Sequence, residues 1–290
     1  MKNKISLGTA NFTQRYGLNR DGLKLSINEI NKILNFSIKH KINNLDTAVA
    51  YAGVEKKLGK FNLKDFKISS KLRPISKNTH NIEKKIFSEI HSSLNKLRVK
   101  RLEILFLHNA NDLIDEKKNL KIYETFKKAK KLNLIKKIGI SVYSVKELIK
   151  IIEKFKIDAV QLPYSLLDRR FEKVYPLLKK KNIYIQVRSI FLQGVLLQKI
   201  ENLPKYFLKF KEIEKLEKWI KKNKISKLET SINFIKQSNF INSYVIGFNN
   251  LEQLAQIIKC FKKKQKLFPK KIFSNNLNLI DPRRWKINLK

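Results

Sequence analysis

Four polar side chains stand at or just after the ends of segments that look like β-strands, and together they could move a proton. They are Asp46, Tyr51, Lys71 and His108, in the segments NNLDTAVAY, FKISSK and LEILFLH. A buried lysine stays charged only beside a partner such as a carboxylate, and a nearby ammonium lowers the pKa of a tyrosine. We therefore expect Asp46 to hold Lys71 charged, and Lys71 to tune Tyr51 as the residue that donates or accepts the proton.

His108 would complete this set, because an imidazole can hydrogen-bond to a substrate oxygen and orient it towards the phenol. The combination suits carbonyl reduction, in which hydride reaches carbon and a proton reaches oxygen. The hydride must come from a cofactor. Taken singly, each residue has a plainer explanation, such as a turn cap for the aspartate, packing for the tyrosine, a solvated position for the lysine and a core position for the histidine. Four such coincidences at consecutive strand ends are improbable together, and this favours the catalytic interpretation.

Strand-like and helix-like runs alternate along the whole chain. The expected strands cover residues 5–10, 43–48, 66–71, 102–108, 136–141, 159–163, 184–189 and 243–247. Such alternation predicts parallel strands covered by helices, and eight units in 290 residues fit a closed (β/α)8 TIM barrel. An open doubly wound sheet is the alternative, but its GxGxxG fingerprint is missing.

The segments between the strands show helical spacing of apolar residues, as in 26–41 and 80–98. Two capping boxes are expected, one pairing Ser26 with Glu29 and the other Ser144 with Glu147.

The second half of the chain carries extra material. The stretch 190–240 is longer than one connection needs, and it predicts two helices, at 206–222 and 227–239. The tail 265–290 runs past the last expected helix. Because the chain has no linker rich in Pro, Gly or Ser, we expect residues 1–290 to form one domain.

Active sites of such barrels lie at the C-terminal ends of the strands. The polar or small residues at the expected strand ends are Asp46, Lys71, His108, Ser141, Gln161, Arg188, Ser189 and Gly247. We expect these residues to line one polar pocket.

The net charge of +40 raises the question of a nucleic-acid or membrane partner. The basic residues are 54 Lys and only ten Arg, and the lysines are scattered over every expected helix. Specific recognition of phosphates and bases favours the planar guanidinium of Arg. We therefore attribute the charge to a composition bias and expect no specific nucleic-acid partner.

Composition also bears on the compartment. The N-terminus lacks the apolar core of a signal peptide, and no run is apolar for long enough to cross a membrane. The single cysteine, Cys260, excludes an internal disulfide and a cysteine metal cluster. A cytoplasmic location is expected.

Several blocks resemble the aldo-keto reductase family. LDTAVAYAGVEKKLG is similar to its Asp/Tyr signature, ISSKL to its lysine strand and LFLHNAND to its histidine strand. GISVYSVKEL, VQLPYSLLD, VRSIFLQGVLL and VIGFNNLEQL match further blocks in the right order, so the resemblance covers residues from about 5 to 260. The opening LGTANFTQRYGL is similar to a bacterial branch that often accompanies surface-sugar biosynthesis.

The resemblance implies a (β/α)8 barrel that reduces aldehydes or ketones, sugar-like ones included, with NADPH and without metal. Asp46, Tyr51, Lys71 and His108 would form the catalytic tetrad, with Tyr51 as the general acid. The cofactor-binding residues would be Gly8, Thr9, Ser141, Gln161, Arg188, Ser189, Leu192, Gly194, Gly247, Asn249 and Gln253. Among them, Ser141 and Gln161 would hold the nicotinamide carboxamide. Residues 189–194 would wrap the pyrophosphate, and 247–253 would hold the adenosine end.

The chain departs from the family pattern at three places. Val142 replaces the asparagine that many members have, and Arg188 replaces an aromatic residue that stacks on the nicotinamide, although a guanidinium plane can also stack or pair with phosphate. Gly247 and Gln253 stand where some members grip the 2′-phosphate with Lys and Arg. NADPH is therefore the expected cofactor, with NADH as the alternative. A non-catalytic barrel that binds the nucleotide as a sensor or partner subunit is the second functional hypothesis.

Overall fold

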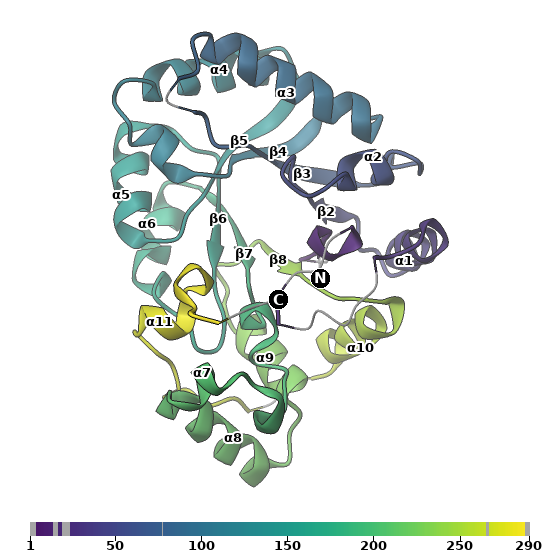
Figure 1. Ribbon diagram of the computed structural model, residues 1–290, viewed down its shortest axis with the longest axis vertical. Helices are drawn as coiled ribbons and strands as arrows, with labels where there is room; N and C mark the ends of the chain where they lie inside the picture. The colour runs from purple at the N-terminus through teal and green to yellow at the C-terminus, as the bar shows by residue number, and fades with distance from the viewer. Residues whose placement is uncertain (1–3, 14–16, 19–23, 77, 265–266, 288–290) are drawn as a thin grey trace.

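The computed structural model describes residues 4–13, 17–18, 24–76, 78–264 and 267–287. Its centre is a closed barrel of eight parallel strands in sequence order (Figure 1). The strands are β1 (Ile5–Gly8), β2 (Asn44–Asp46), β3 (Lys67–Leu72), β4 (Leu102–Leu107), β5 (Ile135–Ser141), β6 (Ala159–Pro163), β7 (Tyr184–Arg188) and β8 (Ser243–Ile246). Every expected strand is present within two residues of its expected bounds, so the (β/α)8 prediction is confirmed.

The barrel is closed by pairing of the first strand with the last. Ser6 of β1 lies opposite Asn44 of β2 on one side and Val245 of β8 on the other. Gly8 suits this closure, because a Cβ atom there would lie 3.0 Å from the carbonyl oxygen of Ile246. The two strands can therefore approach closely at that point.

The helices surround the barrel. They are α1 (Ile27–Lys39), α2 (Val54–Leu58), α3 (Ile82–Leu97), α4 (Asn119–Lys131), α5 (Val145–Lys154), α6 (Tyr175–Lys180), α7 (Lys205–Leu208), α8 (Lys211–Asn223), α9 (Lys227–Lys236), α10 (Leu251–Lys262) and α11 (Leu277–Ile280). Both expected capping boxes are formed, by Ser26 with Glu29 at α1 and by Ser144 with Glu147 at α5.

The main apolar core lies between the strands and these helices, and a small separate cluster fills the barrel interior. The inner cluster joins Ile104 and Phe106 of β4 to Ala159 of β6, with Tyr184 of β7 against it. Gly139 on the intervening strand makes room for it, because a Cβ atom there would lie only 2.4 Å from the Phe106 ring. On the C-terminal side of this cluster the barrel interior is polar, so the strand ends can form a polar site.

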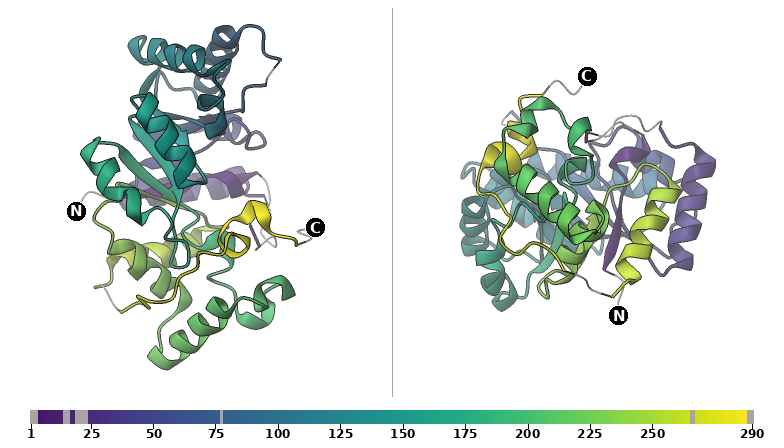
Figure 2. Two further views of the ribbon diagram at one scale, coloured as in Figure 1. Left: turned by 90° about the vertical axis from the view of Figure 1, so that its left-hand side faces the viewer. Right: turned by 90° about the horizontal axis from the view of Figure 1, so that it is seen from below.

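The prediction of a single helix at 206–222 is wrong, because the helix is interrupted between α7 and α8. Phe210 caps α8 in an extended conformation. The break lets both Phe207 and Phe210 be buried, and the Tyr206 ring packs against each of them. Figure 2 shows α7 and α8 standing outside the ring of helices that covers the barrel.

The tail forms short helices that sequence periodicity did not indicate. After α10 the chain runs back across the molecule to α11 and to a 3-10 turn at Pro282–Arg284 (Figure 1). Arg169, in the loop after β6, donates hydrogen bonds to the backbone carbonyls of Pro269, Lys270 and Ile272. This arginine fixes the first part of the tail against the barrel. Residues 265, 266 and 288–290 of the expected tail lie outside the described residues. The same holds for residues 14–16 of the opening segment LGTANFTQRYGL.

Candidate active site

Asp46 and Lys71 form a buried ion pair at the C-terminal ends of β2 and β3. The Lys71 Nζ atom lies 2.7 Å from Asp46 Oδ2, and the two side chains are 2% and 4% exposed. Lys71 also donates a hydrogen bond of 2.9 Å to the backbone carbonyl of Thr47. The pairing that the sequence predicted is therefore present, and both charges are compensated.

The phenol of Tyr51 lies beside this pair. Lys71 Nζ stands 5.3 Å from the centre of the Tyr51 ring. Burial raises the pKa of Tyr51 well above its ordinary value, and the charge of Asp46 adds to the effect, while that of Arg188 opposes it. The expected lowering of the Tyr51 pKa by Lys71 is thus not produced, because burial dominates and the ammonium charge is balanced by Asp46. The phenol keeps its proton at neutral pH.

His108 follows β4 on the same rim, where its backbone N–H donates to the carbonyl of Leu72. Burial lowers the pKa of His108 to about 4, with smaller effects from the charges of Lys71 and Arg188. Its imidazole is therefore neutral at pH 7. The structure brings Asp46, Tyr51, Lys71 and His108 together, as the sequence analysis expected.

A hydrogen bond across the barrel joins this cluster to the opposite wall. Gln161 of β6 donates from Nε2 to Asp46 Oδ1 on β2, at 2.7 Å, and to Gln186 Oε1 on β7, at 2.7 Å. The Gln161 Oε1 atom is buried and has no hydrogen-bond partner within the described residues. A free buried acceptor at this depth fits a ligand that donates from an amide, such as a nicotinamide carboxamide.

The ends of β5 and β7 meet beside Gln161. Ser141 closes β5 and is buried. The Arg188 guanidinium donates to the carbonyl of Val142, at 3.2 Å, and lies 4.1 Å from the centre of the Tyr143 ring. Val142 itself is buried and offers no side-chain hydrogen bond.

The loop after β7 has a backbone conformation that residues other than glycine rarely adopt. Ser189, Leu192 and Gln193 have positive φ angles of 58°, 47° and 50°, followed by Gly194 at 100°. Clustered left-handed residues of this kind occur at functional loops. The N–H groups of Leu192 and Gly194 already donate within the loop, to the carbonyls of Ser189 and Phe191, so a pyrophosphate would be held by the other N–H groups of this segment.

The remaining expected cofactor residues lie on two neighbouring loops. Thr9 is fully buried, and its hydroxyl donates to the carbonyl of Asp46, which makes it a structural link between β1 and β2. A Cβ atom at Gly247 would meet nothing within 4 Å. Asn249 receives a hydrogen bond from Asn11 and donates its backbone N–H to Gln253, whose own N–H is capped by Asn250. Of this group, Thr9 contacts a catalytic candidate, through the backbone carbonyl of Asp46.

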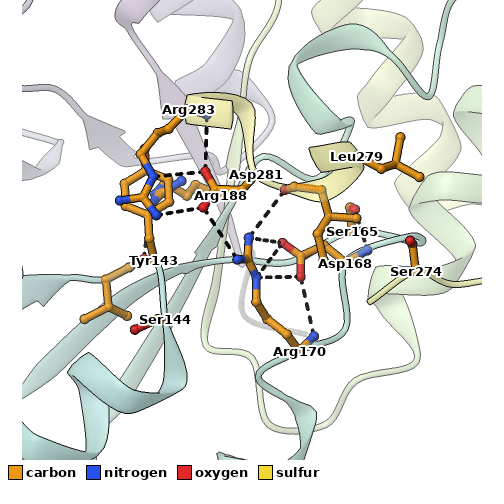
Figure 3. A network of polar contacts seen from close by, with 12 residues as sticks. Tyr143, Ser144, Ser165, Asp168, Arg170, Arg188, Ser274, Leu279, Asp281 and Arg283 are labelled. Carbon is orange, nitrogen blue, oxygen red and sulfur yellow. Dashed lines mark hydrogen bonds and ion pairs between the residues drawn. The ribbon is translucent and has the colours of Figure 1, made fainter. Parts of the chain in front are cut away.

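The tail reaches the same rim through a chain of ion pairs (Figure 3). Asp168 binds Arg170, Arg170 approaches Asp281, and Asp281 binds Arg283 through two hydrogen bonds of 2.9 and 2.7 Å. The Arg283 guanidinium then lies 3.7 Å from the centre of the Tyr143 ring.

Three residues of this rim were missed by sequence reasoning: Gln186, Tyr143 and Arg283. Gln186 could have been found, because it lies two residues before Arg188 on one strand and so shares its face. Tyr143 and Arg283 come from irregular segments with no periodic signal. In the described part of the chain, no group of three His, Cys, Asp or Glu side chains is placed to hold a metal ion, and no helix is both long and apolar enough to cross a membrane.

An eight-stranded parallel barrel with a buried Asp–Lys pair, a tyrosine and a histidine at its C-terminal rim defines the class of protein. The family model described as the aldo/keto reductase family matches residues 4–271. The chain therefore belongs to the aldo/keto reductase family.

Individual relatives are distant. The chain is 25% identical over 182 residues to YqkF of Bacillus subtilis, described as an uncharacterized oxidoreductase, and the match spans 59% of this chain and 58% of that protein. Among solved structures, the holo form of an aldo-keto reductase from Bacillus halodurans superposes with a TM-score of 0.73 at 19% identity, covering 91% of this chain and 88% of that one. A putative aldo-keto reductase from Pseudomonas aeruginosa gives 0.67 at 18% identity, covering 89% of each. These structures support the fold.

Proposed function

We propose that the protein is an NAD(P)H-dependent carbonyl reductase of the cytoplasm that converts a small aldehyde or ketone into an alcohol. The observation that carries this proposal is the cluster of Asp46, Lys71, Tyr51 and His108 on one rim of the barrel. Membership of the family adds a general expectation of carbonyl chemistry.

Each catalytic candidate has a separate task. Tyr51 is the proton donor to the carbonyl oxygen, and the raised pKa of Tyr51 ensures that the proton is present. Neutral His108 hydrogen-bonds to the same oxygen and orients it. Lys71 places a positive charge next to the phenol, where it stabilises negative charge that develops as the proton leaves. Asp46 and Gln161 hold Lys71 in position.

The nicotinamide cofactor would supply the hydride. Ser141 and the free Oε1 atom of Gln161 are suited to its carboxamide. The left-handed loop from Ser189 to Gly194 is suited to the pyrophosphate, and the segment 247–253 to the adenosine end. With Gly247 and Gln253 in place of cationic side chains, NADPH and NADH are both candidates, NADPH being the one that we propose.

The test is Tyr51→Phe, assayed with a generic aldehyde and either cofactor. Loss of a general acid lowers turnover by about 10²- to 10⁴-fold, while binding of the cofactor should be unchanged. Tyr123→Phe is the matched control, because among the residues that the structure describes the Tyr123 hydroxyl donates only to the carbonyl of Lys156, on the outer surface. Retained turnover in Tyr51→Phe would remove the acid role. Cofactor binding without turnover in the unmodified protein would instead indicate a sensor.

A further inference from the structure

One buried carboxyl group close to the proposed active site has no cationic partner. Glu55 of α2 is 4% exposed. Its Oε1 atom accepts hydrogen bonds from the hydroxyls of Ser70, at 2.7 Å, and Ser93, at 3.0 Å. In the described part of the chain no ion pair includes Glu55, whereas the equally buried Asp46 is paired with Lys71.

This environment is unfavourable for a carboxyl group. Each serine hydroxyl has one hydrogen to donate, so two serines satisfy only part of the acceptor capacity of the Glu55 oxygens. Burial of a polar group that is incompletely hydrogen-bonded costs free energy, and an apolar side chain of similar size would avoid that cost. Glu55 is therefore better explained by the geometry that it fixes than by the stability that it adds.

Glu55 joins three elements directly behind Lys71. It connects α2 to β3 through Ser70 and to α3 through Ser93. Ser70 precedes Lys71 in the chain, and neighbouring side chains of a strand point to opposite faces. Lys71 thus faces the barrel interior, where it binds Asp46, while Ser70 faces the helices. The bond to Glu55 therefore attaches α2 to the back of the strand segment that carries Lys71.

The same short helix sets the position of Tyr51. The backbone N–H of Val54, the first residue of α2, donates to the carbonyl of Tyr51. Gly53 between them has a φ angle of 72°, in the left-handed region that favours glycine, and this makes the turn tight. A displacement of α2 would therefore move Tyr51 and change the separation of 5.3 Å between its ring centre and Lys71 Nζ.

Helix α2 depends on its neighbours for its position. It has five residues, and a helix of that length is not stable alone in water. Its C-terminal end is packed closely at Gly59, where a Cβ atom would lie 1.8 Å from the carbonyl oxygen of Lys96 in α3. Its first turn is attached to β3 and α3 by the carboxyl group of Glu55. Loss of that group weakens the attachment of the end of α2 that leads to Tyr51.

We propose that Glu55 is a positioning residue, whose bonds to Ser70 and Ser93 hold Tyr51 at the correct distance from Lys71. This inference rests on the proposed function, in which Tyr51 is the proton donor. Misplacement of a reacting group by about 1 Å lowers turnover by about 10²-fold. Cofactor binding should not change, because the groups suited to the nucleotide lie on other strands and loops.

The first experiment removes the carboxyl group with Glu55→Leu. Turnover of a generic aldehyde should fall by about 10- to 100-fold, with KM for the cofactor unchanged. Glu55→Gln offers the two serines one acceptor and one donor, so it should retain most of the turnover. Ser93→Ala removes one of the bonds and should give a smaller loss of turnover, which tests the proposal even if Glu55→Leu does not fold.

Ser37→Ala is the matched control for Ser93→Ala. Ser37 is also a buried helix serine, but its hydroxyl donates to the carbonyl of Ile33 within α1. This control should keep full turnover. Equal losses of turnover in the two serine variants would overturn the proposal, because a general effect of buried hydroxyls would then explain both.

A double variant shows whether Glu55 acts through Tyr51. Tyr51→Phe removes the proposed acid and leaves a low residual turnover. If Glu55 positions Tyr51, adding Glu55→Leu to Tyr51→Phe should lower that residual turnover by less than about twofold. An equal fall in both backgrounds, or no fall in either, would overturn the positioning role.

A last readout needs no turnover. In protein labelled with fluorotyrosine, the fluorine resonance that disappears in Tyr51→Phe is that of Tyr51, and Tyr123→Phe identifies a distant reference. Glu55→Leu should shift or broaden the Tyr51 resonance and leave that of Tyr123 unchanged. If no aldehyde is reduced, the reductase function fails, but this change would still support the positioning role. An unchanged Tyr51 resonance would refute that role.

Discussion

Replacing Lys71 by Met should destabilise the protein strongly, because it leaves Asp46 buried without its counter-ion. The lysine lies 2.7 Å from Asp46 Oδ2, its side chain is 2% exposed, and it also satisfies the carbonyl of Thr47. Removing one partner of a buried pair costs about 3–5 kcal/mol. Because Gln161 still donates to Asp46 at 2.7 Å, we expect the lower end, about 3 kcal/mol.

Urea denaturation measures this loss. With a dependence of about 2–3 kcal/mol per molar urea, the midpoint should move down by about 1–1.5 M. The double variant Asp46→Asn/Lys71→Met should recover part of the loss, because no uncompensated charge then remains in the barrel.

The matched control is Lys127→Met. Lys127 lies 3.1 Å from Glu124 in a pair whose side chains are both 53% exposed, so its loss should cost no more than about 0.5 kcal/mol. If Lys71→Met were as mild as this control, or if the double variant were no more stable than the single one, the account of Asp46 and Lys71 as a buried, mutually compensating pair would be refuted.

Three further predictions concern the same rim. Gln186→Leu should cost about 1–3 kcal/mol in urea denaturation, because an amide hydrogen of Gln161 loses its buried acceptor, and an unchanged midpoint would contradict this. The pKa of His108, lowered to about 4, lies below its ordinary value, so stability from the neutral imidazole is complete above pH 6.5 and is lost as pH falls towards 4. Between pH 7.5 and 4.5, His108→Gln should lose less stability to urea than the unmodified protein does. Equal losses of stability in the two proteins would exclude this effect of His108. Asp281→Asn should speed amide hydrogen exchange in residues 277–285, since Arg283 loses its bidentate partner; unchanged exchange would mean that other contacts hold the tail.

Much of the barrel could be predicted because its signals are local and periodic. Strand runs such as AVQLP, and capping pairs such as Ser144 with Glu147, indicate the local structure in which they lie. The catalytic candidates followed from the rule that sites occupy the C-terminal strand ends.

What sequence could not reveal depends on distant contacts. The bond from Gln161 to Asp46 joins strands on opposite walls of the barrel, and only closure of the barrel brings them within reach. The direction of the Tyr51 pKa shift was missed because burial depends on the packed loops and not on residue spacing. Arg283 can approach Tyr143 only because the tail reaches the C-terminal rim of the barrel. No pattern in the sequence of the tail indicates this path.

The closure of the barrel between β1 and β8 has a consequence during synthesis. β1 ends at Gly8, and its partner β8 begins at Ser243. At bacterial or eukaryotic elongation rates, on the order of 5–20 residues per second, the first strand waits about 10–50 seconds for the last one. Throughout that interval one edge of β1 has unpaired backbone groups. The nascent chain is therefore most exposed to mispairing and chaperone capture at its oldest segment, and a ribosome that pauses late in the message would prolong that exposure.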